Sequence, residues 1–275
     1  MRRLGPLGRI LVVWLVTSAI AMTLVAVFLA PHLPPGSGSK EAAGQQLDNE
    51  VLTLVSVFVV AGVFTYLGYA LIAFRERGDS DGPPIRGNGR AQTIWVVGTT
   101  VIVLFLAAFG TYQLLGGAGG GQGAEPVFVP AHSGQSPLQV QVIAQQWQFT
   151  YRYPTEGDFE SAHLVLPVDR QIELHVTSLD VIHSFWVPAL GLKADANPGA
   201  DNIAYVTPEK LGNVQIHCAE LCGLFHGYMF GSGSIVTPSA FASWVAAERR
   251  FVAPVTHYLP AYSTTYLPDP SFRAG

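Results

Sequence analysis

Apolar runs along the chain predict membrane helices first and a β-sheet domain after them. Three stretches, residues 10–30, 51–74 and 94–115, carry no charged side chain. Each is long enough to cross a bilayer as a helix, which takes about 20 apolar residues. Beyond Leu115 apolar positions alternate with polar ones, as in strands that bury one face.

Arginines flank the apolar stretches on one side of the membrane. They lie before residue 10 and in the loop between the second and third stretches: Arg2, Arg3, Arg9, Arg75, Arg77, Arg86 and Arg90. Because such residues stay on the cytoplasmic side, we expect a multi-pass protein of the cell membrane with everything after Leu115 outside. A basic start and an apolar core also fit export, so residues 1–30 are either a cleaved signal peptide or a retained helix. Either interpretation leaves the second and third stretches as a hairpin.

Short runs in which apolar and polar residues alternate predict a β-sandwich or a small Greek-key barrel. In the first of them Leu138, Val140 and Val142 alternate with glutamines. The other runs are separated by Pro, Gly and Asp turns and cover residues 147–153, 163–166, 171–177, 203–206, 214–217 and 234–236. A short amphipathic helix over 239–250, with Ser239 as its cap, is expected to pack on the sandwich.

These patterns divide the chain into five parts. Residues 1–50 hold the leader or first helix and an outer loop, 51–115 the helical hairpin, and 125–250 the β domain. Residues 116–124 are expected to be a flexible link, because six of the eight residues from Gly116 to Gly123 are glycine. The proline-rich segment 251–275 is expected to be an extended or wrapping tail.

Composition and charge support a membrane protein with an acidic outer domain. Only 12% of the residues are charged, against about a quarter in an average soluble domain, so part of the chain must face lipid. Residues 116–275 hold seven Lys/Arg and thirteen Asp/Glu, a net charge of −6. Such a domain suits a basic protein partner and argues against binding nucleic acid.

The segment from Cys218 to Met229 places two thiols, an imidazole and a thioether within twelve residues. Soft sulfur and imidazole ligands select copper, whereas structural zinc sites need four Cys or His ligands at other spacings. A single blue-type copper uses one Cys, two His and a weak axial Met, so the second thiol indicates a second copper ion. Two bridging thiolates with one His on each metal need one His besides His226. We expect it to be His183, carried to the rim of the sandwich by the loop after residues 171–177.

A structural disulfide is the other interpretation of Cys218 and Cys222, because the chain has no further cysteine and such bonds are common outside the cell. Neither cysteine forms a C-x-x-C-H motif, so no covalently bound c-type haem is expected. His183 alone would be an ordinary rim histidine. Other histidines on predicted strands are expected to face solvent or to bond locally: His163, His175 and His217.

Every position of the pattern C-x-E-x-C-G-x-x-H-x-x-M is filled from Cys218 to Met229, and on it the chain resembles subunit II of cytochrome c oxidase, which carries the CuA centre. The resemblance covers roughly residues 50–245. It implies a membrane-anchored all-β fold, in which N-terminal transmembrane helices precede a cupredoxin-like β-sandwich. It also implies a subunit of a proton-translocating oxidoreductase. Electrons from cytochrome c would arrive at the copper pair and pass to haem in subunit I, where oxygen is reduced to water.

The resemblance also implies a ligand set for the binuclear copper, namely His183, Cys218, Glu220, Cys222, His226 and Met229. The cysteines would bridge, Met229 would be a weak axial ligand, and Glu220 would contribute its backbone carbonyl. The Glu220 side chain would also reach a magnesium or manganese ion shared with subunit I. Asp195, in the loop from Gly191 to Gly199, would lie near that junction.

Trp147 begins the aromatic run WQFTY, which matches the strand on which the family receives electrons from cytochrome c. Without the resemblance a large core aromatic is the plainer interpretation. Phe149 stands where the family usually has another tryptophan, which puts a longer aromatic relay in doubt. The acids Glu156, Asp158 and Glu160 could steer a basic cytochrome, although a charge run is usually a solvated face.

Two positions depart from the family pattern. Gln92 stands where many relatives carry a glutamate at the mouth of a proton path, and a neutral amide cannot take up a proton. Ala200 follows Pro198 and Gly199 where an arginine is usual, which removes one interface contact.

Two other functions stay open. One is the CuA subunit of a nitric oxide reductase or of an oxidase with another donor. The other is a membrane-tethered protein that stores or delivers copper. A nitrous oxide reductase is disfavoured because it carries a second large catalytic domain, and a quinol oxidase because its subunit II lacks the two cysteines.

Overall fold

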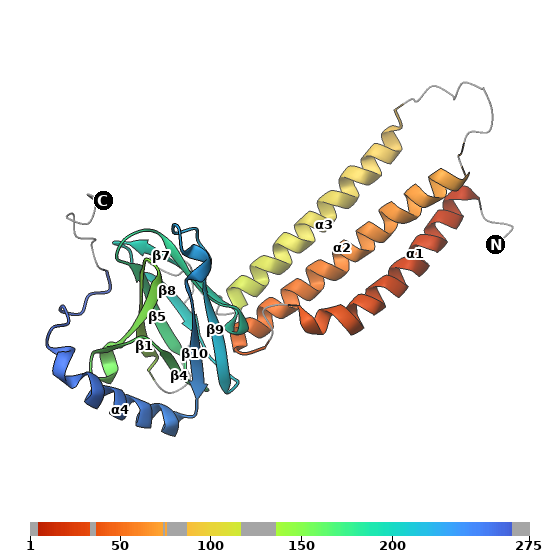
Figure 1. The fold of residues 1–275 in the computed structure, drawn as a ribbon. Helices are drawn as coiled ribbons and strands as arrows, with labels where there is room; N and C mark the ends of the chain where they lie inside the picture. Colours follow the sequence, from red (N-terminus) through yellow and green to blue (C-terminus); the bar gives the residue numbers. More distant parts are fainter. Residues whose placement is uncertain (1–4, 34–36, 74, 76–86, 117–135, 266–275) are drawn as a thin grey trace. The chain divides into compact units, whose positions relative to one another are not determined.

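The computed structural model describes residues 5–33, 37–73, 75, 87–116 and 136–265 (Figure 1). These residues fall into two compact units. One contains residues 1–33 and 47–113, and the other contains residues 34–46 and 114–275. The predicted link lies outside the described residues except for Gly116, and so does the end of the predicted tail, 266–275.

Three helices carry the apolar stretches. Helix α1 covers Pro6–Leu24 and continues through η1 (Val25–Leu29) and η2 (Ala30–His32), α2 covers Lys40–Ala73, and α3 covers Gly89–Gly116. By length and composition all three are able to cross a membrane. Helix α2 begins well before residue 51, because the apolar pattern marks only the lipid-facing part of a helix and its first turns are polar.

Ten strands form the β-sandwich. They are β1 (Leu138–Gln145), β2 (Gln148–Tyr153), β3 (Phe159–Ser161), β4 (Leu164–Pro167), β5 (Ile172–Ser178), β6 (His183–Val187), β7 (Leu192–Pro198), β8 (Asn202–Val206), β9 (Gly212–Cys218) and β10 (Phe230–Val236). Their order is β3-β2-β1-β5-β7-β6-β9-β10-β4, with β8 paired to β5. Strand β7 connects the two layers, because it pairs with β5 at Thr177–Asn197 and with β6 at His183–Ala196. This confirms the predicted cupredoxin-like sandwich behind N-terminal apolar helices.

Strands β3, β6 and β7 were not among the predicted runs. Strand β7 buries Leu192, Ala194 and Ala196, but alanine gives a weak alternation signal and the intervening residues include a lysine and an aspartate. Strand β6 begins directly at His183, so its apolar run is too short to mark a strand.

Helix α4 (Pro238–Thr256) covers one end of the sandwich core. Its Trp244 ring contacts the rings of Tyr153 and Phe159 at centroid distances of 5.1 and 5.6 Å. The predicted cap is wrong: the Thr237 side chain, not that of Ser239, accepts the N–H of Ala240. The helix also continues beyond residue 250 to Thr256, so the first residues of the predicted tail are helical.

The described part of the tail lies against the sheet. The buried guanidinium of Arg152 donates to the Pro260 carbonyl at 3.0 Å and lies 5.5 Å from the centre of the Tyr262 ring. The Gln141 amide donates to the Ser263 carbonyl at 2.6 Å. Residues 260–263 therefore cover a polar part of the sheet that would otherwise face water.

The start of α2 packs within the β-domain unit, which the sequence did not predict. The Ser39 hydroxyl donates to the Leu190 carbonyl at 2.7 Å, and Glu41 accepts the N–H of Thr207 at 3.0 Å. A Cβ at Gly191, whose φ is +59°, would lie 2.9 Å from the Cα of Ala42. Glycine at this position thus permits the close approach of the two segments.

His175 is bonded locally, as expected for a histidine on a strand. Its Nδ1 lies 2.8 Å from Asp201 and its Nε2 lies 3.1 Å from Glu173. Burial lowers the pKa of His175, but the two carboxylates outweigh it and hold that pKa above its ordinary value.

We expect a His175→Gln variant to lose stability in acid rather than in base. A raised folded-state pKa contributes stability that is complete below the unfolded value, about 6.5, and disappears as the pH rises through the folded value. The loss should be about 2 kcal/mol at pH 5.5, the scale of a charged hydrogen bond, and small at pH 9. Urea unfolding of the outer domain at both pH values measures it, with the exposed His163→Gln as the control. An equal loss at both pH values would contradict a charged His175.

Candidate metal centre

The loop between β9 and β10 brings a cluster of soft donors to one rim of the sandwich. Strands β9 and β10 pair in antiparallel fashion, and the N–H of Cys218 donates to the Met229 carbonyl at 3.0 Å, so the two ends of the loop are adjacent. Gly223 in this loop has φ +111°, and a Cβ there would lie 2.9 Å from Nε2 of Gln146. A larger residue at 223 would therefore disturb both the turn and its neighbour.

His183 reaches the loop from β6, the strand beside β9. The pairing of Phe185 with Cys218 sets His183 close to the thiols, and its side chain is fully buried. Its Nε2 lies 2.9 Å from Asp180, so with a proton there Nδ1 is free and lies 3.8 Å from Cys218 Sγ.

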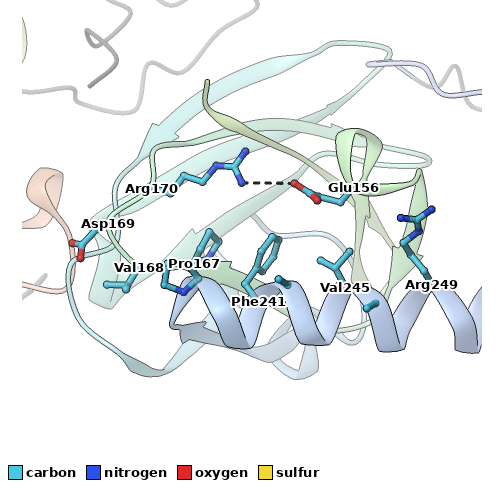
Figure 2. Close-up of a pocket in the computed structure, with 11 residues that line it drawn as sticks. Glu156, Pro167, Val168, Asp169, Arg170, Phe241, Val245 and Arg249 are labelled. Atoms are coloured by element: carbon cyan, nitrogen blue, oxygen red, sulfur yellow. Dashed lines mark ion pairs between the residues drawn. The ribbon is translucent and has the colours of Figure 1, made fainter. Parts of the chain in front are cut away.

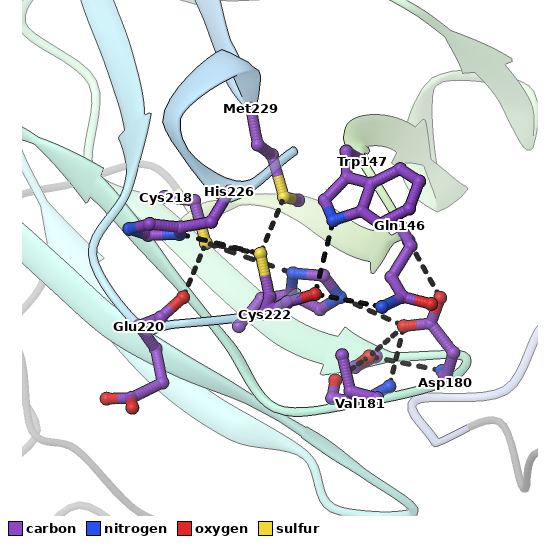
Figure 3. Close-up of polar contacts among 11 residues, drawn as sticks. Gln146, Trp147, Asp180, Val181, Cys218, Glu220, Cys222, His226 and Met229 are labelled. Atoms are coloured by element: carbon purple, nitrogen blue, oxygen red, sulfur yellow. Dashed lines mark hydrogen bonds and ion pairs between the residues drawn. The ribbon is translucent and has the colours of Figure 1, made fainter. Parts of the chain in front are cut away.

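The structure brings together the six residues predicted as ligands (Figure 3). The two sulfurs, Cys218 Sγ and Cys222 Sγ, are 3.7 Å apart. His183 Nδ1 and the Glu220 carbonyl lie 3.8 and 3.3 Å from Cys218 Sγ. His226 Nδ1 and Met229 Sδ lie 3.5 and 3.8 Å from Cys222 Sγ. Each thiol therefore has one imidazole and one weak donor beside it.

The two thiols differ in acidity without metal. Burial raises the pKa of Cys218, but the His183 hydrogen bond and neighbouring backbone groups outweigh it and lower that pKa to about 6. Burial and the neighbouring Cys218 raise the pKa of Cys222 to about 12. Since metals bind thiolates, loading this site would release the Cys222 proton.

The sequence analysis did not predict Asp180 and Gln146, which form hydrogen bonds to His183 and to the Cys222 carbonyl. Besides facing His183, Asp180 accepts the N–H of Gln146 at 2.7 Å and that of Val181 at 2.6 Å. The Gln146 side chain donates to the Cys222 carbonyl at 2.8 Å. A metal-ligating histidine needs a partner for its second nitrogen, so an aspartate three residues before His183 was a signal available in the sequence.

Trp147 contacts the same carbonyl, and its indole N–H donates to Cys222 O at 3.2 Å. The Phe225 ring packs edge-on to it at 4.8 Å, and the exposed Tyr228 ring follows at 6.3 Å from Phe225. Phe149 is buried against Phe185 in the core and is not part of this row.

The acidic loop after β2 forms ion pairs with arginines of the same domain. Arg152, only 1% exposed, donates to both oxygens of Asp158 at 2.6 and 2.8 Å and lies 3.9 Å from Glu160. Glu156 lies 3.7 Å from Arg170. Asp158 and Glu160 therefore hold a buried cation, which reduces the negative charge that this loop presents; steering of a basic cytochrome by these acids stays a prediction.

The other predicted positions lie away from the sulfurs. The exposed Glu220 side chain extends to the side of the cluster opposite Trp147 (Figure 3), and Asp195 accepts the Ser184 hydroxyl at 2.7 Å. Among the described residues, the one close group of three metal-ligating side chains is His183, Cys218 and Cys222. Gln92 lies in the first turn of α3, and Ala200 follows β7 in a turn.

A cavity of about 530 Å³ beside α4 does not belong to this cluster (Figure 2). Phe241 and Val245 form its apolar floor, and the Glu156–Arg170 pair lies above them. Its lining contains no sulfur or imidazole, so it is unlike the donor cluster in chemistry.

A soft donor cluster on a cupredoxin-like sandwich, joined to apolar helices, defines a membrane-anchored copper-binding protein with an extracytoplasmic domain. Residues 160–236 match the family model "Cytochrome C oxidase subunit II, periplasmic domain". Cytochrome c oxidase subunit 2 of Synechocystis sp. is 32% identical over 272 residues, 83% of this chain and 80% of that protein. The corresponding protein of Cereibacter sphaeroides is 26% identical, over 89% of this chain and 91% of its own length.

Among solved structures, the periplasmic domain of subunit II from Bradyrhizobium japonicum is similar. It is 33% identical, covers 45% of this chain and 99% of its own length, and has a TM-score of 0.42. The chain belongs to the cytochrome c oxidase subunit II family. It therefore has a subunit II role in a haem-copper oxidase.

Proposed function

We propose that this chain receives electrons from a cytochrome c at a binuclear CuA centre and passes them to haem in subunit I, where oxygen is reduced to water. The observation that carries the proposal is the two-ended donor arrangement, in which each of two thiols 3.7 Å apart has its own imidazole. One copper ion could use a single thiolate and two imidazoles, which would leave the second buried thiol without a function.

The residues of this chain would hold the metals in fixed positions. Cys218, Cys222, His183 and His226 would be the strong ligands of the copper pair, and Met229 and the Glu220 carbonyl would be the weak ones. When bound, the copper pair supplies one-electron redox chemistry. Asp180 holds the His183 ring, and burial of His183 and both thiols excludes water, so the ligands need to move little when the charge changes.

Trp147 is proposed as the residue at which electrons arrive from the donor. Its ring connects the Cys222 carbonyl to the Phe225 and Tyr228 rings, and Tyr228 is 76% exposed. Leu221 and Leu224 on the same loop are also exposed. Because the nearby acids are paired, we expect the donor to dock mainly through apolar contacts, with a weak dependence on salt.

The Glu220 side chain is proposed to reach a magnesium or manganese ion shared with subunit I. It extends away from the thiols and is free to meet another chain. We further propose that the helices cross the plasma membrane several times, as the arginine distribution indicates.

A Trp147→Phe variant tests the electron path. Losing the indole N–H bond to Cys222 O should slow electron transfer within the bound complex about tenfold or more, equal to about 1.4 kcal/mol of barrier. Stopped-flow reduction by cytochrome c at saturating donor measures this rate, and Trp186→Phe, a partly exposed tryptophan beside His217, is the matched control. An unchanged saturating rate with an intact copper spectrum would show that electrons arrive elsewhere.

A further inference from the structure

Helix α1 makes fitted contacts with α2 within the helical unit. The Trp14 indole N–H donates to the Phe58 carbonyl at 3.0 Å, and the two rings lie 4.6 Å apart. The hydroxyls of Thr17 on α1 and Thr65 on α2 are 3.2 Å apart. An indole N–H in lipid must find an acceptor within the protein, and this one finds it on α2.

Gly62 makes room for this contact. A Cβ at position 62 would lie 3.0 and 3.1 Å from Nε1 and Cε2 of Trp14, so even alanine would press on the indole. Small residues at the point of closest approach are characteristic of packed membrane helices. The next glycine of α2, Gly68, differs, because a Cβ there would meet nothing within 4 Å.

The rest of α1 has the dimensions of a resident helix. With its η1 and η2 continuations it covers 27 residues, Pro6–His32, whereas the apolar core of a signal peptide covers about 7–15. Ser18, next to Thr17, is 2% exposed in this unit although it lies mid-helix. The small-residue pattern Ala19-Ile20-Ala21, where a signal peptidase could cut, lies within the same continuous helix.

We infer that residues 6–32 are retained in the mature protein as a third membrane helix, fitted to α2 through Trp14, Gly62, Thr17 and Thr65. If these residues were cleaved, the space at Gly62 would lose the Trp14 ring that fills it. The Thr65 hydroxyl would lose its contact with Thr17. Retention also places α1 between one face of α2 and the surrounding lipid or subunits. The inference concerns the helical unit alone, so it holds or fails independently of the copper chemistry.

Intact-mass measurement of this subunit in the oxidase purified from its own membranes tests retention. We expect a chain that begins ahead of Trp14. A mature chain that begins at Met22, or anywhere after Thr17, has lost both contacts and overturns the inference.

A second experiment tests the contact itself in the full-length chain. A protease site placed at residues 34–36 allows α1 to be cut from α2 in the purified, detergent-solubilised oxidase. After cutting, the α1 fragment should stay bound in the parent and in Gly68→Leu, and most of it should be lost in Gly62→Leu. Loss of the fragment from the parent, or equal retention in both glycine variants, would show that the Trp14–Gly62 contact does not hold α1.

Discussion

An Asp158→Asn variant is expected to lower the free energy of unfolding of the outer domain by about 3 kcal/mol, because it leaves the buried Arg152 charge short of its main partner. Arg152 is 1% exposed and is held by two hydrogen bonds to Asp158. Glu160 at 3.9 Å and the Pro260 carbonyl would compensate only in part. Asp158 has φ +52°, a region that asparagine also tolerates, so the substitution changes the charge and little of the backbone preference.

Glu156→Gln is the matched control in the same loop. Glu156 and Arg170 are 27% and 28% exposed and lie 3.7 Å apart, so losing their attraction should cost less than about 1 kcal/mol. Chemical denaturation of both variants gives the comparison. Equal, small losses would mean that Arg152 does not depend on Asp158, and the loop would again be available to steer a cytochrome.

A Cys222→Ser variant is expected to bind one copper instead of two and to lose most electron transfer from cytochrome c. The variant keeps one thiolate, Cys218, and both imidazoles, His183 and His226, which with Met229 make the donor set of one copper of the mononuclear blue type. His226 and Met229 lose the sulfur beside which they lie, so the second copper has no thiolate. Metal analysis and the visible spectrum measure the change.

Gly227→Ala is the control for disturbance of the loop, since a Cβ there meets nothing within 4 Å. It should keep both coppers and the parent spectrum. Two coppers retained by Cys222→Ser would remove the reason for assigning a bridging role to Cys222.

The apolar and alternating patterns predicted the architecture because burial imposes them directly. Three lipid-length stretches and the alternation at Leu138, Val140 and Val142 correspond to α1 to α3 and β1. The elements that were not predicted depend on tertiary contacts, which produce no local alternation of apolar and polar residues in the sequence. Strand β7 is defined by alanines and by its pairing with β5 and β6, and the start of α2 by its contacts with Leu190 and Thr207.

The candidate site was predictable for a different reason. Two thiols, an imidazole and a thioether within one short loop have few uses together, and the unmet need for a second imidazole pointed to His183. Gln146 was missed because its bond to the Cys222 carbonyl becomes visible only once those atoms are placed. Asp180, three residues before His183, could have been predicted as the partner of the second ring nitrogen of that histidine. The pairing of Asp158 with Arg152 was also missed, because the sequence does not show whether a charged side chain in a loop forms an ion pair with one on a strand or faces solvent.

Copper stoichiometry with electron spin resonance tests the central claim most directly. Residues 124–275, expressed alone and loaded with copper, should bind two coppers for each chain. The spectrum should be that of one unpaired electron shared equally by two copper nuclei. One copper for each chain with a mononuclear spectrum would contradict a binuclear centre held by Cys218 and Cys222.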